Sequence, residues 1–172
     1  MKQRDVATVI DALNRAGVRY LVVGGIAVIH WGYLRYTSDL DLVLELTPEN
    51  LRTASAALAP LGYTPKIPAR LEQLADTALV ARWKSEKGML VFQLWSDRFR
   101  DIPIDVFIEE PFPFSAELER SARGEVMQGI GMPVVSYQTL RDLKTSAGRM
   151  TDLADLEGLA QVHANLARDD QR

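Results

Sequence analysis

A chain of 172 residues, of which 47% are hydrophobic and 25% charged, is long enough to form one domain with a buried core of its own. It contains no cysteine, so disulfide bonds and thiolate chemistry are excluded. The net charge is −3 with acidic and basic residues interspersed, and without a basic block nothing indicates a long polynucleotide substrate, so no DNA partner is expected.

The N-terminal residues include no apolar stretch of the signal-peptide type. The longest apolar run, residues 21–29, is too short to cross a bilayer. We therefore expect a cytoplasmic protein that does not bind to a membrane.

The first half of the chain predicts helices that alternate with strands. Apolar residues from Val6 to Leu13 recur at helical spacing, and Gly17 is placed to end that helix. Gly24-Gly25 lets the backbone turn tightly, and Thr47-Pro48 is typical of an N-cap followed by the first residue of a helix. The predicted elements are a helix at 5–16, a strand at 20–23, a helix at 26–33, a strand at 38–46 and a helix at 48–59.

The second half predicts strands followed by helices. Residues 71–84 have a helical pattern, although their second half, residues 78–83, also suits an extended strand. Pro111 and Pro113 then interrupt the chain, and no element is predicted between them and residue 125. The remaining elements are an edge strand at 63–67, strands at 89–95 and 102–108 around a polar connection, one or two short strands at 125–136, and helices at 137–147 and 151–166.

The order of these elements predicts an α/β fold of the α+β type, in which helices flank a mixed, twisted β-sheet. We expect a single domain over residues 1–172. Its core spans about residues 1–136, and a short helical C-terminal segment spans about residues 137–168.

Two carboxylates on one predicted strand form the most informative motif. Asp39 and Asp41 flank Leu40, in the strand that follows Gly24-Gly25 and the short helix. Side chains alternate faces along a strand, so both carboxylates point the same way while Leu40 points into the core. Two like charges on one face repel each other unless cations lie between them. Pairs of divalent metal ions serve this purpose in phosphoryl and nucleotidyl transfer, so the motif predicts a metal site.

A third acid lies on another predicted strand. Asp105 is the only charged residue in the apolar segment 102–108, where an unpaired buried carboxylate would be costly. The alternative is that the strand is half-exposed and Asp105 points outward without a function. Its apolar neighbours favour a functional role as a metal ligand or a general base. Asp97 and Asp101, in the preceding connection, are expected to be solvated.

The order of strand, Gly24-Gly25, short helix and Asp39-Leu40-Asp41 resembles the signature of the nucleotidyltransferase superfamily, which includes DNA polymerase beta. The resemblance implies the nucleotidyltransferase fold and the transfer of NMP from an NTP to a hydroxyl group, with release of pyrophosphate. It implies that Asp39, Asp41 and Asp105 hold two Mg²⁺ ions and are catalytic. Gly24 and Gly25 would bring backbone N–H groups to the phosphates.

A second cluster of charged residues resembles the AbiEii-like branch of this superfamily, which contains toxins of toxin–antitoxin systems. Residues 144–155 match a Lys…Arg-x-x-Asp-x-x-Asp pattern, and residues 35–39 also resemble that branch. The resemblance implies a nucleotide site that includes Thr37, Ser38, Lys144, Arg149 and Asp152. The alternative is a solvated helical face on which the charged residues form ion pairs of little energetic weight.

The sequence leaves the acceptor open. RNA such as tRNA, a protein or a small molecule can each supply a hydroxyl group, and the toxin-like branch would add a cognate antitoxin as a partner. A small acceptor suits a chain of this length without a basic face, and would make the protein an aminoglycoside- or lincosamide-modifying enzyme. The remaining alternative is a non-catalytic binding partner with the same fold, although the intact carboxylates argue against it.

Overall fold

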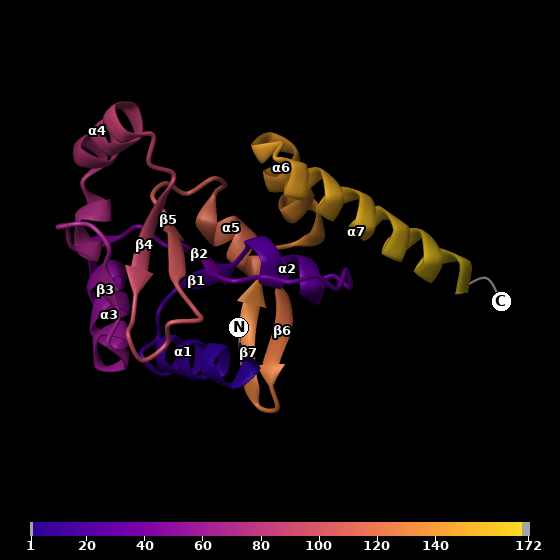
Figure 1. Cartoon of the computed structure of the whole chain (residues 1–172), viewed down its shortest axis with the longest axis horizontal. Helices are drawn as coiled ribbons and strands as arrows, with labels where there is room; N and C mark the ends of the chain where they lie inside the picture. Colours follow the sequence, from indigo (N-terminus) through magenta and orange to yellow (C-terminus); the bar gives the residue numbers. More distant parts are fainter. Residues whose placement is uncertain (1, 170–172) are drawn as a thin grey trace.

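A computed structural model describes the backbone of residues 2–169 and the side chains of residues 2–164. Within these residues, one mixed sheet has seven strands in the order β3-β4-β5-β2-β1-β7-β6. The strands are β1 (Tyr20–Val22), β2 (Leu40–Leu44), β3 (Thr64–Pro65), β4 (Val91–Trp95), β5 (Ile104–Phe107), β6 (Ala122–Met127) and β7 (Ile130–Val134). The predicted mixed sheet flanked by helices is confirmed (Figure 1).

The helices pack on the sheet and on one another. They are α1 (Gln3–Arg15), α2 (Gly24–His30), α3 (Pro48–Leu58), α4 (Thr77–Lys87), α5 (Phe114–Glu119), α6 (Tyr137–Ala147) and α7 (Met150–Asp169), with 3-10 helices η1 (Ala59–Leu61) and η2 (Leu71–Ala75). α1 contacts α3 and the β6–β7 hairpin, whereas α2 contacts β2 and α6. α7 packs against α6 and extends away from the sheet (Figure 1). Among the described helices, none has the length and apolar character needed to span a bilayer.

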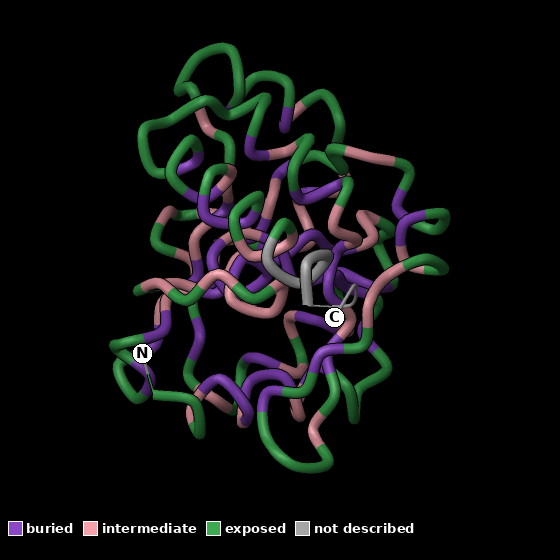
Figure 2. The backbone as a smooth tube through the Cα atoms, turned by 90° about the vertical axis from the view of Figure 1, so that its right-hand side faces the viewer, coloured by how far each residue is buried: buried purple, intermediate pink, exposed green. Residues whose placement is uncertain are grey.

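The centre of the sheet is built from strands whose apolar side chains are fully buried. β2 pairs antiparallel with β1 and parallel with β5, and β5 pairs antiparallel with β4. Leu40 and Leu42 of β2 are completely buried, as are Ile104 and Val106 of β5. The buried segments gather in the middle of the molecule (Figure 2). This core fixes which face of each central strand is left for polar residues.

Local signals at element ends account for several confirmed boundaries. Gly17 adopts a left-handed φ of 70° directly after Ala16, the C-cap residue of α1. The Thr47 side chain accepts a hydrogen bond from the backbone N–H of Asn50 at 3.3 Å, which caps α3. The Ser136 side chain caps α6 in the same way. The edge strand near Pro65 is confirmed as β3, at one end of the sheet.

The predicted helix at 71–84 is wrong as one element. Asp76 has an extended backbone between η2 and α4, and its side chain accepts a hydrogen bond from Leu79 N–H at 3.0 Å. Asp76 therefore caps a new helix, and residues 78–83 are helical rather than extended. The sequence does not predict α5, because Pro111 and Pro113 indicate an interruption, whereas in the structure Pro113 occupies the N-cap position of this helix. The assignment of one domain over residues 1–172 stays a prediction, and Met1 and residues 170–172 lie outside the described residues.

Candidate active site

Two adjacent strands carry the three predicted carboxylates to one place. β2 and β5 run parallel with Asp41 directly opposite Asp105, and Asp39 lies immediately before β2. Carboxylate oxygens of the three residues all lie within 4.8 Å of one another. All three residues are half-buried. A group of oxygen ligands of this kind suits a hard divalent cation such as Mg²⁺.

Gly24 approaches Asp41, and Gly25 approaches Thr37, more closely than any other residue type permits. A Cβ at Gly24 would lie 1.9 Å from Asp41 Oδ2, and the backbone there has a left-handed φ of 61°. A Cβ at Gly25 would lie 2.3 Å from Thr37 Oγ1. The two glycines begin α2, so backbone N–H groups of its first turn lie beside the carboxylates.

Two neighbouring side chains orient the acids. Thr37 Oγ1 donates a hydrogen bond to Asp39 Oδ1 at 3.1 Å. Gln93 of β4 lies opposite Asp105 in the sheet, and its Nε2 donates to Asp105 Oδ1 at 2.6 Å. One carboxylate oxygen of Asp39 and one of Asp105 are therefore each held by a neighbouring side chain.

The electrostatics of the site favour a bound cation. The pKa of the Asp41 carboxyl is raised to about 6, first by burial and then by the negative charges of Asp39 and Asp105. A backbone hydrogen bond from Gly25 and the charge of Lys144 act in the opposite direction. Burial also raises the pKa of Asp105, an effect that the Gln93 hydrogen bond opposes. Crowded carboxylates with raised pKa values are stabilised when positive charge is placed between them.

A cleft of about 650 Å³ opens above the acids, a volume typical of small-molecule sites. One part of its lining is polar, and the other part is apolar and comes from β4, β5 and α6. The sequence-predicted site residues all line it: Gly24, Gly25, Thr37, Ser38, Asp39, Asp41, Asp105, Lys144, Arg149 and Asp152. The apolar lining includes Leu90, Val91, Phe107, Leu140 and Leu143.

Lys144, Arg149 and Asp152 form ion pairs at the edge of this cleft. Lys144 Nζ lies 2.9 Å from Asp152 Oδ1, and Arg149 Nε lies 2.6 Å from Asp152 Oδ2. Lys144 and Asp152 are buried, whereas 72% of the Arg149 side chain is exposed. The alternative of a solvated helical face is therefore wrong for Lys144 and Asp152. Their ion pairs, which that alternative also expected, are present but buried.

Three residues near the site were not predicted as site residues, although Arg35 and Asp155 lie in the segments that resemble the AbiEii-like branch. Gln93 orients Asp105, and Arg35 forms a salt bridge with the buried Asp155, with 2.8 Å between Arg35 Nε and Asp155 Oδ1. Asp155 also lies 2.7 Å from Lys144 Nζ. The signal for Gln93 was its place as the one polar residue of an apolar strand, at an alternate position facing the same way as Asp105.

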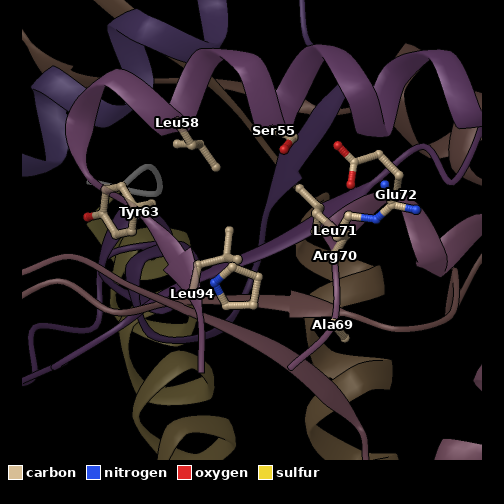
Figure 3. Close-up of a pocket in the computed structure, with 9 residues that line it drawn as sticks. Ser55, Leu58, Tyr63, Ala69, Arg70, Leu71, Glu72 and Leu94 are labelled. Carbon is tan, nitrogen blue, oxygen red and sulfur yellow. The ribbon is translucent and has the colours of Figure 1, made fainter. Parts of the chain in front are cut away.

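A second, smaller cavity of about 150 Å³ lies between α3, η2 and the β3–β4 edge of the sheet (Figure 3). Leu58, Tyr63 and Leu94 supply much of its apolar lining, with Arg70 and Glu72 at its rim. None of the predicted site residues lines it. The cleft above the acids is therefore the candidate active site.

Comparisons with known proteins give a likeness in fold rather than in sequence. No family model matches the sequence, and no curated protein matches it. Among solved structures, the chain resembles the lincosamide antibiotic adenylyltransferase LnuA, lincomycin-bound, with a TM-score of 0.60 and 13% identity. That match covers 93% of this chain and 97% of LnuA.

Two further structures are similar. ANT(2")-Ia in complex with adenylyl-2"-tobramycin has a TM-score of 0.55 and 13% identity, over 91% of this chain and 86% of that one. JHP933 from Helicobacter pylori has a TM-score of 0.51 and 15% identity, over 92% of this chain and 64% of that one. At such identities the likeness concerns architecture alone. The mixed sheet and its flanking helices have the nucleotidyltransferase fold.

Proposed function

We propose that this protein is an Mg²⁺-dependent nucleotidyltransferase that transfers NMP from an NTP to a hydroxyl group of an acceptor. The observation that carries the proposal is the cluster of Asp39, Asp41 and Asp105, whose carboxylate oxygens lie within 4.8 Å of one another in the floor of a cleft. The fold shared with LnuA and ANT(2")-Ia supports the same reaction class.

The donor set fits divalent metal ions. Asp39, Asp41 and Asp105 would hold two Mg²⁺ ions, because their carboxylate oxygens lie close together and all three residues line the cleft. Bound Mg²⁺ supplies charge neutralisation for the triphosphate and for the transition state. The raised pKa of Asp41 supports this assignment, since a cation would favour its ionised form.

The polar lining of the cleft suits a triphosphate. Gly24 and Gly25 are the first two residues of α2. Their backbone N–H groups lie at the end of the helix where the helix dipole favours an anion. Thr37 and Ser38 add hydroxyl groups on the cleft surface. Arg149, with most of its side chain exposed, is a cation that a phosphate can reach. Lys144 contributes mainly its charge, because its ammonium group is already bonded to Asp152 and Asp155, and Asp152 in turn orients Arg149.

Asp105 is suited to act as the general base. In the reaction, the acceptor oxygen forms a bond to the α-phosphorus, the bond from that phosphorus to the β-phosphate oxygen breaks, and pyrophosphate leaves. The acceptor hydroxyl loses its proton to a carboxylate oxygen of Asp105. Gln93 occupies Oδ1 of Asp105, so Oδ2 is the oxygen available for this step.

The acceptor that receives the NMP could belong to one of two classes. A toxin of the AbiEii-like branch would modify RNA such as tRNA or a protein, and would have a cognate antitoxin. A small-molecule acceptor is the second candidate, supported by the apolar part of the cleft and by LnuA and ANT(2")-Ia, which were solved with lincomycin and adenylylated tobramycin. A non-catalytic binding role is the least supported, because the carboxylate cluster is intact.

The test is nucleotide transfer from each α-labelled NTP with Mg²⁺, in separate reactions with total tRNA, with lincosamide and aminoglycoside antibiotics, and with the protein alone. Label should appear in one acceptor and be absent with the Asp39→Asn/Asp41→Asn double variant. The matched control is Asp97→Asn/Asp101→Asn, which removes two exposed acids from the β4–β5 connection. If the Asp39/Asp41 double variant bound Mg²⁺–NTP as tightly as the wild-type protein, the proposal would be wrong.

A further inference from the structure

The segment between α2 and β2 lies along α7 in a series of close contacts. A Cβ at Gly32 would lie 2.9 Å from Val162, and a Cβ at Gly158 would lie 2.4 Å from the Tyr33 ring. The next contact is the salt bridge of Arg35 with Asp155. Residue numbers rise along the segment while they fall along α7, so the two run antiparallel. The segment that leads to Asp39 is therefore held against the C-terminal helix.

Arg35 connects α7 to the backbone just before the acids. Its Nη2 donates a hydrogen bond to Asp155 Oδ2 at 3.1 Å. Its Nε lies 2.8 Å from Asp155 Oδ1 as an ion pair, without the geometry of a hydrogen bond. Its Nη1 donates to the carbonyl oxygen of Tyr36 at 2.8 Å. One guanidinium group thus fixes the peptide that precedes Thr37 relative to a buried carboxylate on α7.

The chain of contacts ends at a proposed metal ligand. Thr37 is buried, packs against Gly25, and donates its hydroxyl hydrogen to Asp39 Oδ1 at 3.1 Å. We infer that Arg35 and Asp155 are positioning residues, which set the orientation of Asp39 through Tyr36 and Thr37 and thereby the affinity of the site for divalent metal. The inference rests on the proposed function, because it requires Asp39 to bind metal.

The charge cluster makes this inference testable without unfolding the protein. Asp155 accepts from both Arg35 and Lys144, and Lys144 is also paired with Asp152. Asp155→Asn therefore leaves Lys144 with one carboxylate, and about a quarter of the Arg35 side chain is exposed and reaches water. Arg35→Met leaves Asp155 paired with Lys144. Neither change strands a buried charge, which is the usual cause of severe destabilisation.

The experiment measures Mn²⁺ binding by calorimetry and the Mg²⁺ dependence of nucleotide transfer, for Arg35→Met, Asp155→Asn and the double variant. We expect each single variant to bind Mn²⁺ about tenfold more weakly, as for other residues that orient metal ligands. The rate at saturating Mg²⁺ should stay within about twofold of wild type, because a high metal concentration compensates for a lower metal affinity. It would not compensate for a loss of folded protein. The double variant should be no worse than the single variants, since both residues act through one contact.

The matched control is Arg19→Met, which breaks the Arg19–Glu45 ion pair of 3.0 Å outside the cleft and should leave Mn²⁺ affinity unchanged. Arg35→Lys keeps the charge but cannot donate to both Asp155 and the Tyr36 carbonyl with the guanidinium geometry, and it should give an intermediate affinity. This variant provides the test if Arg35→Met does not fold. Unchanged Mn²⁺ affinity in the variants would overturn the inference alone, as would a slower rate at every Mg²⁺ concentration with unchanged affinity. A wild-type protein that bound no Mn²⁺ would overturn the proposed function as well.

Discussion

Gly24 and Asp41 lie so close together that a methyl group on the glycine would overlap the carboxylate, at 1.9 Å from Oδ2. Gly88, at the end of α4, has nearly the same backbone conformation, with φ of 60° against 61°, but no heavy atom within 4 Å of the position where a Cβ would lie. Comparing alanine substitutions at Gly24 and Gly88 therefore distinguishes the effect of backbone strain from the effect of displacing an acid.

We predict that Gly24→Ala abolishes most of the activity and Gly88→Ala does not. Both substitutions place alanine in the left-handed region, which costs about 1–2 kcal/mol of unfolding free energy. Only Gly24→Ala also displaces Asp41, and a shift of about 1 Å at a reacting centre lowers rates about 100-fold. Urea unfolding and transfer rates measure the two effects. Equal activities of the two variants would contradict the close approach.

Gln93 is predicted to support the rate rather than the fold. Gln93→Met removes the 2.6 Å hydrogen bond to Asp105 Oδ1 and keeps the side-chain length. Loss of such an orienting contact should lower the transfer rate about tenfold with little change in unfolding free energy. Gln128→Met, in the exposed turn between β6 and β7, is the control and should change neither quantity. A full rate in Gln93→Met would mean that Asp105 needs no orientation.

Substitution of Lys144 is predicted to lower mainly the stability of the protein, whereas substitution of Arg149 is predicted to weaken mainly the binding of NTP. Lys144→Met takes a buried partner from both Asp152 and Asp155, each of which keeps one arginine, and should lower the unfolding free energy by about 1–3 kcal/mol. Arg149→Met removes a side chain that is 72% exposed, and should cost about 1 kcal/mol or less. Its effect should appear as a higher KM for NTP. Thermal unfolding and steady-state kinetics on both variants check this contrast, and the reverse pattern would refute it.

The carboxylate cluster predicts a pH-dependent stability in the absence of metal. The pKa of Asp41 is raised from 3.8 to about 6 by burial and by its acidic neighbours, and that of Asp105 is raised as well. Between these values the folded protein binds more protons than the unfolded chain, so their contribution to the free energy of unfolding falls as pH rises from about 4 to about 6.

Asp41→Asn isolates this contribution. In EDTA, the unfolding free energy of the variant minus that of the wild-type protein should increase between pH 4.5 and pH 7. Only the wild-type protein acquires a buried negative charge at position 41 as pH rises, and that charge destabilises its folded state. Mg²⁺ should stabilise the wild-type protein more at pH 7 than at pH 4.5. A difference between the two proteins that did not change with pH would show that Asp41 ionises freely in the folded state.

The sequence predicted those features that depend on local pattern. Alternation along residues 38–46 indicated the common face of Asp39 and Asp41, and the buried Leu40 and Leu42 bear this out. The capping residue Thr47 predicted the start of α3. The break at Asp76 was missed, because an aspartate between two apolar helical turns fits one long helix as well as a cap between two.

Contacts between distant segments were beyond local pattern. The Arg35–Asp155 pair joins residues 120 positions apart, and nothing in either neighbourhood indicates the other. Gln93 required knowledge of the register between β4 and β5. The charged residues at 144–155 allowed two interpretations, a nucleotide site or a solvated helical face. The structure excludes the solvated face for Lys144, Asp152 and Asp155, because the packing of α6 against α7 buries them.

Gln93, Asp105 and Asp41 lie opposite one another on three adjacent strands. The backbone hydrogen bonds between these strands therefore set the distances between the three side chains. The spacing between neighbouring strands is about 4.8 Å whatever side chains they carry. The exposed side chains of the connection at residues 96–103, such as Asp97 and Asp101, can therefore change without moving an oxygen. A single residue inserted into β5 would instead turn Asp105 into the core and bring an isoleucine or valine to the cleft. Such a site allows wide drift in sequence while the distance between its charges stays constant.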